Sequence, residues 1–132
     1  MRLHIVTTCQ TEFIDITSKI AAVVRAAGMT DGMVFISSVH TTGAITINEN
    51  ADPDVTRDLA AILDRMVPWE NGYHHREGNA AAHMKTSLMG ASEWVAVENG
   101  KLVLGTWQGI YFCEFDGPRQ RQVVVKLIDD SR

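Results

Sequence analysis

The sequence predicts one compact α+β domain whose strands pair mainly antiparallel. Short β-prone segments separated by turns recur along the chain, and three stretches between them carry apolar residues at helical spacing. The 132 residues, of which 45% are hydrophobic, can bury a core without disulfides or metal ions. No linker, repeat or low-complexity tract divides the chain, so we expect a single domain over residues 1–132.

Eight short segments have the composition or the alternation that is typical of strands. An Asn99–Gly100 pair between two of them is a hairpin-turn signal, which favours antiparallel pairing. The strands have no obvious charged device at their edges, so we expect another subunit to cover some edges or faces. The expected strands are residues 3–7, 13–16, 33–36, 44–48, 94–97, 102–104, 110–112 and 123–127.

Three helices are expected from their capping residues and spacing. Threonine, aspartate or asparagine stands where each helix should begin, and glycine or proline stands where it should end. Between the second and third helices, residues 69–78 have no periodicity and form the longest expected loop. The expected helices run from Thr17 to Gly28, from Asp52 to Pro68 and from Asn79 to Gly90.

The bulk properties exclude several classes of protein. A net charge of −4, with scattered Lys and Arg, disfavours a nucleic-acid-binding surface. Cys9 and Cys113 match neither a CxxC motif nor a disulfide framework, which is typical of a reducing compartment. There is no signal peptide and no apolar run of membrane-spanning length. We therefore expect a soluble, cytoplasmic protein without nucleic-acid or membrane partners.

Four of the five histidines fall in two short segments. His40 lies at an expected strand end, His74 and His75 lie in the long loop, and His83 lies on the third helix. Because neighbours in an extended loop point to opposite sides, only one of the loop pair should face a site. His40, His75 and His83 could converge on a divalent metal ion. Zinc suits imidazole ligands, and magnesium is not excluded as the ion although it prefers oxygen ligands. The alternative is that these are ordinary solvated histidines of a loop.

Two carboxylates and one arginine could act beside these histidines. Glu49 and Glu77 are the nearest acidic residues in sequence, and each could be a general base, orient an imidazole or bind metal. Solvent exposure is the alternative for both. Arg119 follows an Asp-Gly-Pro turn that would hold it in place, so its guanidinium could bind a phosphate. An ordinary surface arginine is the alternative there.

Two further loops could contact a ligand. Trp107 and Gln108 stand between two glycines, which would let a ligand approach the backbone closely, although a β-bulge is as good an explanation. Thr41 and Thr42 follow His40 and supply hydroxyl and backbone N–H groups for an anion. A Ser-His-Asp hydrolase is poorly supported because there is no GxSxG motif.

Three long motifs resemble the YjbQ-like family, in the right order and over essentially the whole chain. They are HTTGAITINENADPDV (40–55), EGNAAAHMKTSLMG (77–90) and LGTWQGIYFCEFDGPR (104–119). The resemblance implies a two-sheet β-sandwich, assembled as a homotrimer with a site near the subunit interfaces. It also implies secondary thiamine-phosphate synthase activity, which joins a pyrimidine-methyl diphosphate to a thiazole phosphate. Arg119, Lys85 or a metal ion would then meet the departing diphosphate, and Trp107 would stabilise the developing cation.

The candidate residues follow from the residue types together with this resemblance. Two other functions stay open: a metal-dependent hydrolase of a phosphoester or lactone, and a non-catalytic trimeric protein that binds a metabolite. In each case the expected partner is a small phosphorylated or anionic metabolite. The candidates are Glu49, Glu77 and Arg119 for catalysis, Thr41, Thr42, Asn48, Asn79, Lys85, Trp107 and Gln108 for substrate binding, and His40, His75 and His83 for the metal ion.

Overall fold

Strands and helices alternate in the first two thirds of the chain, and strands alone make up the rest. The computed structural model describes residues 1–131. Its helices are α1 (Thr17–Ala27), α2 (Pro53–Met66) and α3 (Ala80–Met89). Its strands are β1 (Arg2–Val6), β2 (Glu12–Asp15), β3 (Gly32–Ser38), β4 (Gly43–Glu49), β5 (Ser92–Glu98), β6 (Lys101–Leu102), β7 (Gln108–Glu114) and β8 (Gln120–Asp129).

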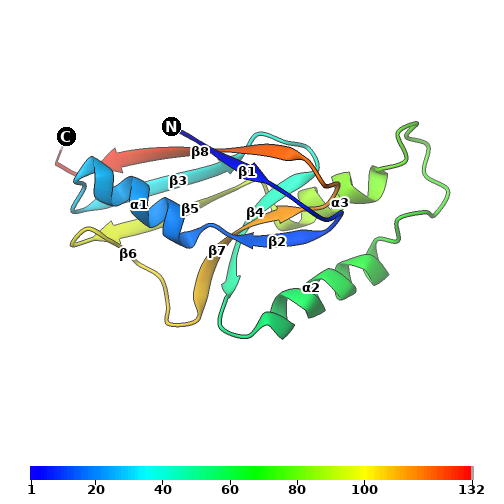
Figure 1. The fold of residues 1–132 in the computed structure, drawn as a ribbon, viewed down its shortest axis with the longest axis horizontal. Coiled ribbons are helices and arrows are strands. Elements are labelled where there is room, and N and C mark those ends of the chain that lie inside the picture. Colours follow the sequence, from blue (N-terminus) through cyan, green and yellow to red (C-terminus); the bar gives the residue numbers. More distant parts are fainter. Residues whose placement is uncertain (132) are drawn as a thin grey trace.

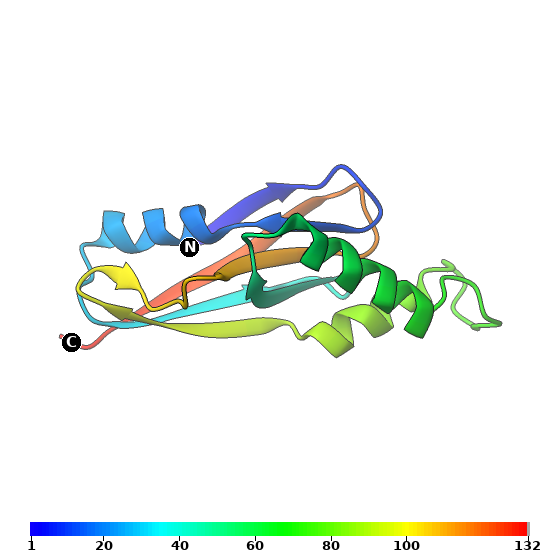
Figure 2. The same cartoon turned by 90° about the horizontal axis from the view of Figure 1, so that it is seen from below.

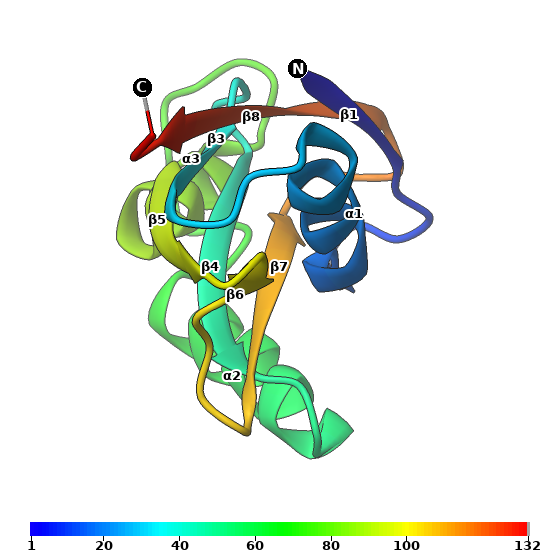
Figure 3. The ribbon, with the colours of Figure 1, turned by 90° about the vertical axis from the view of Figure 1, so that its left-hand side faces the viewer.

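The strands form two antiparallel sheets; the sequence pattern predicted the antiparallel pairing, and the family resemblance implied the two sheets. A five-stranded sheet has the order β1-β8-β3-β5-β6, and a three-stranded sheet has the order β2-β7-β4. The long strand β8 pairs with β1 on one side and with β3 on the other, so it joins the two ends of the chain. Figure 3 shows β1 and β8 of the larger sheet above, β4 and β7 of the smaller sheet below them and α2 at the bottom. The predicted α+β sandwich of two sheets is confirmed.

The main core lies between the two sheets and α1. Isoleucines and valines of β3, β5 and β8 pack there against Ile45 and Phe112 of the smaller sheet and against Ile20 and Val24 of α1. Gly43 begins β4 directly against Phe112, because a Cβ at this glycine would lie 2.4 Å from Phe112 Cζ. The side chain of Phe112 on β7 therefore fills the space beside the first residue of β4, within the smaller sheet.

A smaller core lies on the other face of the three-stranded sheet. Leu63 of α2 and Ala82 of α3 pack there against Tyr111, Cys113 and other residues of the sheet. In Figures 1 and 2, α2 and α3 lie at the same end of the molecule, and the loop between them extends beyond that end. No helix in residues 1–131 is both long enough and apolar enough to span a bilayer.

The helix boundaries agree with the sequence prediction except at one cap. Asp52 caps α2 by accepting a hydrogen bond from Asp54 N–H at 2.9 Å, as expected. Gly28 ends α1 in the left-handed conformation, with φ of 66°. The expected N-cap at Thr17 is wrong, because the cap position is Ile16. The Thr17 hydroxyl instead accepts from Ile110 N–H at 2.8 Å and so ties α1 to β7.

Candidate functional site

A polar cavity of about 410 Å³ opens where four segments meet. These segments are the β3–β4 loop, the long loop together with the start of α3, the β7–β8 loop, and the first residues of β8. All three histidines that the sequence grouped together line this cavity, together with both threonines, one of the carboxylates and the arginine of the Asp-Gly-Pro turn. The lining residues are Val39, His40, Thr41, Thr42, His75, Glu77, Asn79, His83, Asp116, Arg119 and Arg121.

A buried ion pair forms the floor of the cavity. Glu114 ends β7 and is 0% exposed, and Arg121 is the second residue of β8 and is 5% exposed. Arg121 Nε donates to Glu114 Oε1 at 2.8 Å, and Arg121 Nη2 donates to Glu114 Oε2. Arg121 Nη2 also donates to the Thr42 hydroxyl at 2.8 Å. These bonds fix the guanidinium plane, and no described residue accepts a hydrogen bond from its remaining nitrogen, Nη1.

Further donors hold Glu114 in its ionised form. The Thr7 hydroxyl donates to Oε1 at 2.7 Å, and Asp116 N–H donates to Oε2 at 3.0 Å. Burial raises the pKa of Glu114, but the hydrogen bonds from Arg121, Asp116 and Thr7 outweigh it and leave the pKa below its usual value. The pair is therefore charged at neutral pH.

His40 is held as a neutral imidazole. Its Nε2 accepts a hydrogen bond from Gln122 N–H at 2.9 Å, which assigns the proton of the neutral ring to Nδ1. Burial, and then the charge of Arg121, lower the pKa of His40 below 6.5. Because the Nε2 lone pair is already used, His40 in this position is a hydrogen-bond donor through Nδ1–H and does not fit a metal ligand.

His75 and His83 form an edge-to-face pair with their ring centres 5.3 Å apart. His75 comes from the exposed loop and His83 from the first turn of α3, where it is half-buried. Two imidazoles on one zinc ion, each with a nitrogen about 2 Å away, hold their ring centres roughly 5 Å apart. The ring-centre distance of this pair is close to that value. No group of three or more His, Cys, Asp or Glu side chains within residues 1–131 is arranged to hold one.

Asp116 connects the two walls of the cavity. Its Oδ2 accepts from Asn79 Nδ2 at 2.8 Å and from Arg119 Nη2 at 2.9 Å. Arg119 Nε donates to the Asp116 carbonyl at 2.8 Å, so the turn holds this arginine as the sequence predicted. Asn79 Oδ1 is buried and accepts no hydrogen bond from the described residues. The start of α3 is thus joined to the β7–β8 loop by side chains alone.

Several candidates lie outside the cavity. Lys85 is 2% exposed, and its ammonium group pairs with Asp64 of α2, so it ties α3 to α2 and is not available to a ligand. Another group lies at the far end of the smaller sheet, where Glu49 pairs with Gln108 in register. Six residues of strand separate that end from Gly43, which is about 20 Å. This distant group comprises Asn48, Glu49, Trp107 and Gln108.

The distant group has its own hydrogen bonds. Gln108 Oε1 accepts from Gly105 N–H at 2.8 Å, and Asn48 Oδ1 accepts from Glu49 N–H at 2.7 Å. The Glu49 carbonyl accepts from the Tyr111 hydroxyl at 3.0 Å, while Trp107 is 63% exposed. These contacts shape a turn, and within one subunit they bring no group to the histidines.

Glu114 and Arg121 were not among the residues that the sequence pattern indicated for the site. A signal for Glu114 was present, because it is the one carboxylate in the otherwise apolar run 110–115. An ionisable residue inside an apolar strand is buried only with a charged partner. Nothing in the local pattern around Arg121 indicated that it is the partner.

We expect His40 to make folding stability depend on pH. Since its pKa is lowered in the fold, the unfolded chain binds more protons just below pH 6.5. The free energy of unfolding should be fully retained above 6.5 and should fall as the pH falls through the lowered pKa. Gln in place of His40 can still accept from Gln122 N–H, so His40→Gln should flatten this slope in urea unfolding between about pH 5.5 and 7.5. Equal slopes in both proteins would show that His40 does not titrate this way.

Comparison with known proteins gives consistent matches over the whole chain. The family profile described as "UPF0047 protein YjbQ-like" matches residues 1–130. UPF0047 protein YugU of Bacillus subtilis is 55% identical over 127 residues, which is 96% of each chain. A crystal structure of a YjbQ/UPF0047 protein from Clostridium acetobutylicum superposes with a TM-score of 0.95 at 54% identity and covers 97% of this chain and 99% of that one.

These relatives correct the expected activity. UPF0047 protein MJ1081 of Methanocaldococcus jannaschii, 45% identical over 98% of this chain and 94% of its own length, has no activity in its name. A Sulfolobus solfataricus structure with a TM-score of 0.94, 31% identical over 98% of this chain and 96% of that one, is described as a YbjQ-like protein of unknown function.

The expectation of thiamine-phosphate synthase activity is therefore wrong. The geometry gives a physical reason, because Lys85 is paired with Asp64 and Trp107 lies at the other end of β7, so neither meets Arg119 in the cavity. By similarity along its whole length, this chain belongs to the UPF0047 (YjbQ-like) family, a family of unknown function.

Proposed function

We propose that this chain binds a small phosphorylated or carboxylated metabolite in the cavity lined by the three histidines, with Arg121 as the buried contact. The observation that carries the proposal is the guanidinium of Arg121. Three of its hydrogen bonds fix its plane against Glu114 and Thr42, and its Nη1 is left without a protein acceptor. A buried cation with unused N–H groups facing a polar cavity is suited to an anion.

Other donors surround the same space. His40 offers Nδ1–H, and Arg119, whose side chain is 50% exposed, has one guanidinium nitrogen, Nη1, that does not donate to Asp116. The hydroxyl and backbone groups of Thr41 lie at the open side of the cavity. Donors fixed before binding lose little freedom when the ligand arrives, which favours affinity. A volume of about 410 Å³ suits a small metabolite and not a polymer.

Anion titration tests the two arginines. Arg119→Ala should weaken binding of inorganic phosphate by about 1.5 kcal/mol. This value is at the low end for a charge-assisted hydrogen bond, because the side chain of Arg119 is half-exposed. Arg119→Lys should recover part of the lost affinity. Arg121→Lys keeps a charge beside Glu114 but loses the planar fork, and should weaken binding by about 1.5–3 kcal/mol. Calorimetry measures each affinity, and circular dichroism checks folding.

Arg57→Ala is the matched control, since Arg57 is an exposed arginine of α2 that pairs with Asp54 away from the cavity. It should leave phosphate affinity unchanged. If folded Arg121→Lys and both Arg119 variants bind phosphate as tightly as the parent protein, the cavity is not the anion site.

A second candidate is metal-assisted hydrolysis of a phosphoester or lactone, which the spacing of His75 and His83 favours. A zinc ion held there would activate water when bound, and Glu77 in the same cavity could take the proton. His83→Ala should then lower zinc affinity at least tenfold, measured by competition with a chromogenic chelator. His74→Ala is the control, because His74 does not line the cavity. An equal loss of zinc affinity in both variants, or no loss in either, would contradict a zinc site at His75 and His83.

We also propose a homotrimer, in which other copies cover the outer face of the five-stranded sheet. That face carries Trp94, 50% exposed, against Phe35 with ring centres 4.9 Å apart, and Ile128, 46% exposed. Adjacent exposed apolar residues of this kind usually mark an interface.

Light scattering tests the assembly. The mass of the assembly should be near three times 14.6 kDa. Trp94→Glu should lower this mass, because the new carboxylate would have to lose its water when the subunits associate. Thr30→Glu adds the same charge in an exposed loop and should leave the mass unchanged. A mass of 14.6 kDa for the parent protein at micromolar concentration would contradict the assembly.

A further inference from the structure

The cavity lined by the three histidines (the histidine cavity) carries unused hydrogen-bond acceptors as well as unused donors. Asp116 Oδ2 accepts from Asn79 and Arg119, but Asp116 Oδ1 accepts from no described residue. Glu77 is an exposed residue of the long loop that lines the cavity, and its carboxylate has no described partner. A ligand held by Arg121 therefore also meets acceptors that need a donor.

Asn79 supplies a further acceptor in the same wall. It lines the cavity and is 6% exposed, and its Oδ1 accepts no hydrogen bond from the described residues. A buried acceptor without a donor destabilises the fold until a donor reaches it. Asp116 Oδ1 is not one of the buried unpartnered atoms, so it is open to solvent. Both oxygens favour a ligand that carries N–H or O–H groups.

The charges of the histidine cavity leave one carboxylate without a counterion. Arg121 is already paired with Glu114. Arg119 is already paired with Asp116 at 2.9 Å. Glu77 is the lining carboxylate that has no cationic partner among the described residues. The net charge is therefore negative, which disfavours a ligand that is only anionic and favours one that also carries a cationic group.

We propose that the ligand of the histidine cavity is a small zwitterion that carries a carboxylate and a primary ammonium group. Its carboxylate accepts from Arg121, so this proposal rests on the proposed function. Its ammonium donates to Asp116 and Asn79 and lies close to Glu77. A primary ammonium has three N–H donors and no acceptor, whereas a hydroxyl has one donor and no charge. The ammonium thus matches both the unused acceptors and the charge of the cavity.

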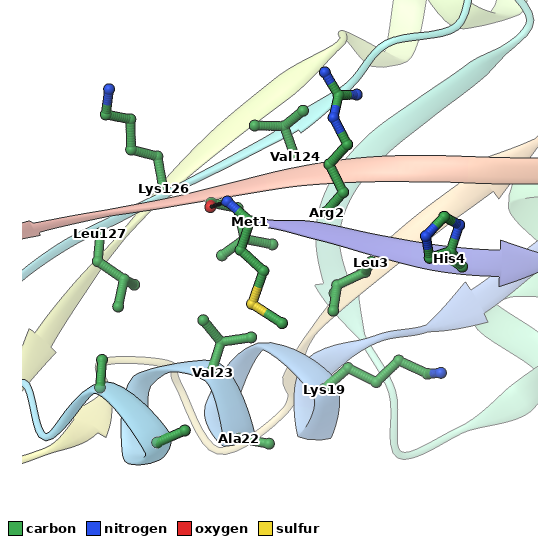
Figure 4. A pocket seen from close by; sticks show the side chains of 13 residues that line it. Met1, Arg2, Leu3, His4, Lys19, Ala22, Val23, Val124, Lys126 and Leu127 are labelled. Carbon is green, nitrogen blue, oxygen red and sulfur yellow. Dashed lines mark hydrogen bonds between the residues drawn. The ribbon is translucent and has the colours of Figure 1, made fainter.

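A second cavity could bind the same probes and has to be separated from the first. It has a volume of about 1010 Å³ and lies between α1 and the strands β1 and β8 (Figure 4). Its basic side chains are Arg2, Lys19 and Lys126. The two cavities share no lining residue. Amide NMR shifts of Thr41 and Thr42 therefore report binding in the histidine cavity, and shifts along α1 report binding in the other.

Matched pairs of probes test the ammonium. Glycine, β-alanine and γ-aminobutyrate are compared with propionate, butyrate and valerate, in which a methyl group replaces the ammonium at the same chain length. Divalent ions are first removed with a chelator and dialysis, and the titrations are run at about pH 8, where an ordinary imidazole is neutral. At one or more lengths the amino acid should bind at least fivefold more tightly than its partner. A smaller preference at every length would overturn the proposal.

Two glutamates of the same loop provide a variant and its control. Glu77→Gln keeps the shape of the side chain without its charge, and should lower the preference for the amino acid at least twofold. Glu70→Gln removes the same charge from an exposed position that does not line the cavity, and should leave the preference unchanged. Full preference in folded Glu77→Gln, or an equal loss in both variants, would overturn the proposal.

Arg121→Lys separates this proposal from the proposed function. It should weaken binding of both members of a matched pair about tenfold, because both place their carboxylate on the guanidinium. If it weakens phosphate binding while the parent protein binds no amino acid, or does not prefer it to its partner, the anion site stands and the zwitterion is wrong. If folded Arg121→Lys binds phosphate and every probe as tightly as the parent protein does, the anion site fails and the zwitterion fails with it.

Discussion

The buried pair of Glu114 and Arg121 is the constraint on which the histidine cavity depends. Two charges out of water are tolerated only when each is paired and hydrogen-bonded, and removal of one partner typically costs about 3–5 kcal/mol. Glu114 and Arg121 meet this condition with Thr7 and Thr42, which belong to two other segments. The pair therefore fixes the end of β7, the start of β8 and the loops around them in one arrangement.

The rest of the cavity is attached to this fixed floor by weaker links. The His40 imidazole is held through one hydrogen bond from the backbone of β8, and Asn79 is held through Asp116. His75 and Glu77 come from an exposed loop with few such contacts. In the proposed function, the fixed floor would hold the anion at one end, while the groups of the histidine wall, which have fewer contacts, could adjust to the rest of the ligand.

The elements of this fold could be predicted from sequence because their signals are local. Capping residues and apolar spacing place α2 and α3, and the alternation of β4 predicts its half-buried strand. The division into sheets of five and three strands has no such local signal. The pairing of β1 with β8, for example, joins residues at opposite ends of the sequence. The resemblance to a known family supplied the two-sheet architecture.

The residues of the candidate site also fall into those that local sequence signals indicate and those that only the tertiary structure reveals. His40, His75 and His83 could be grouped because they stand near turns and helix starts, where side chains face open space. Lys85 was assigned to a ligand on its charge alone, but the tertiary position of Asp64 decides its partner. Glu114 and Arg121 form the opposite case, since they lie seven residues apart on the consecutive strands β7 and β8, which belong to different sheets, and the path of the loop between these strands brings them together. A basic residue near a histidine motif is thus a weaker guide to a binding site than a carboxylate inside an apolar strand, because burial obliges that carboxylate to have a cationic partner.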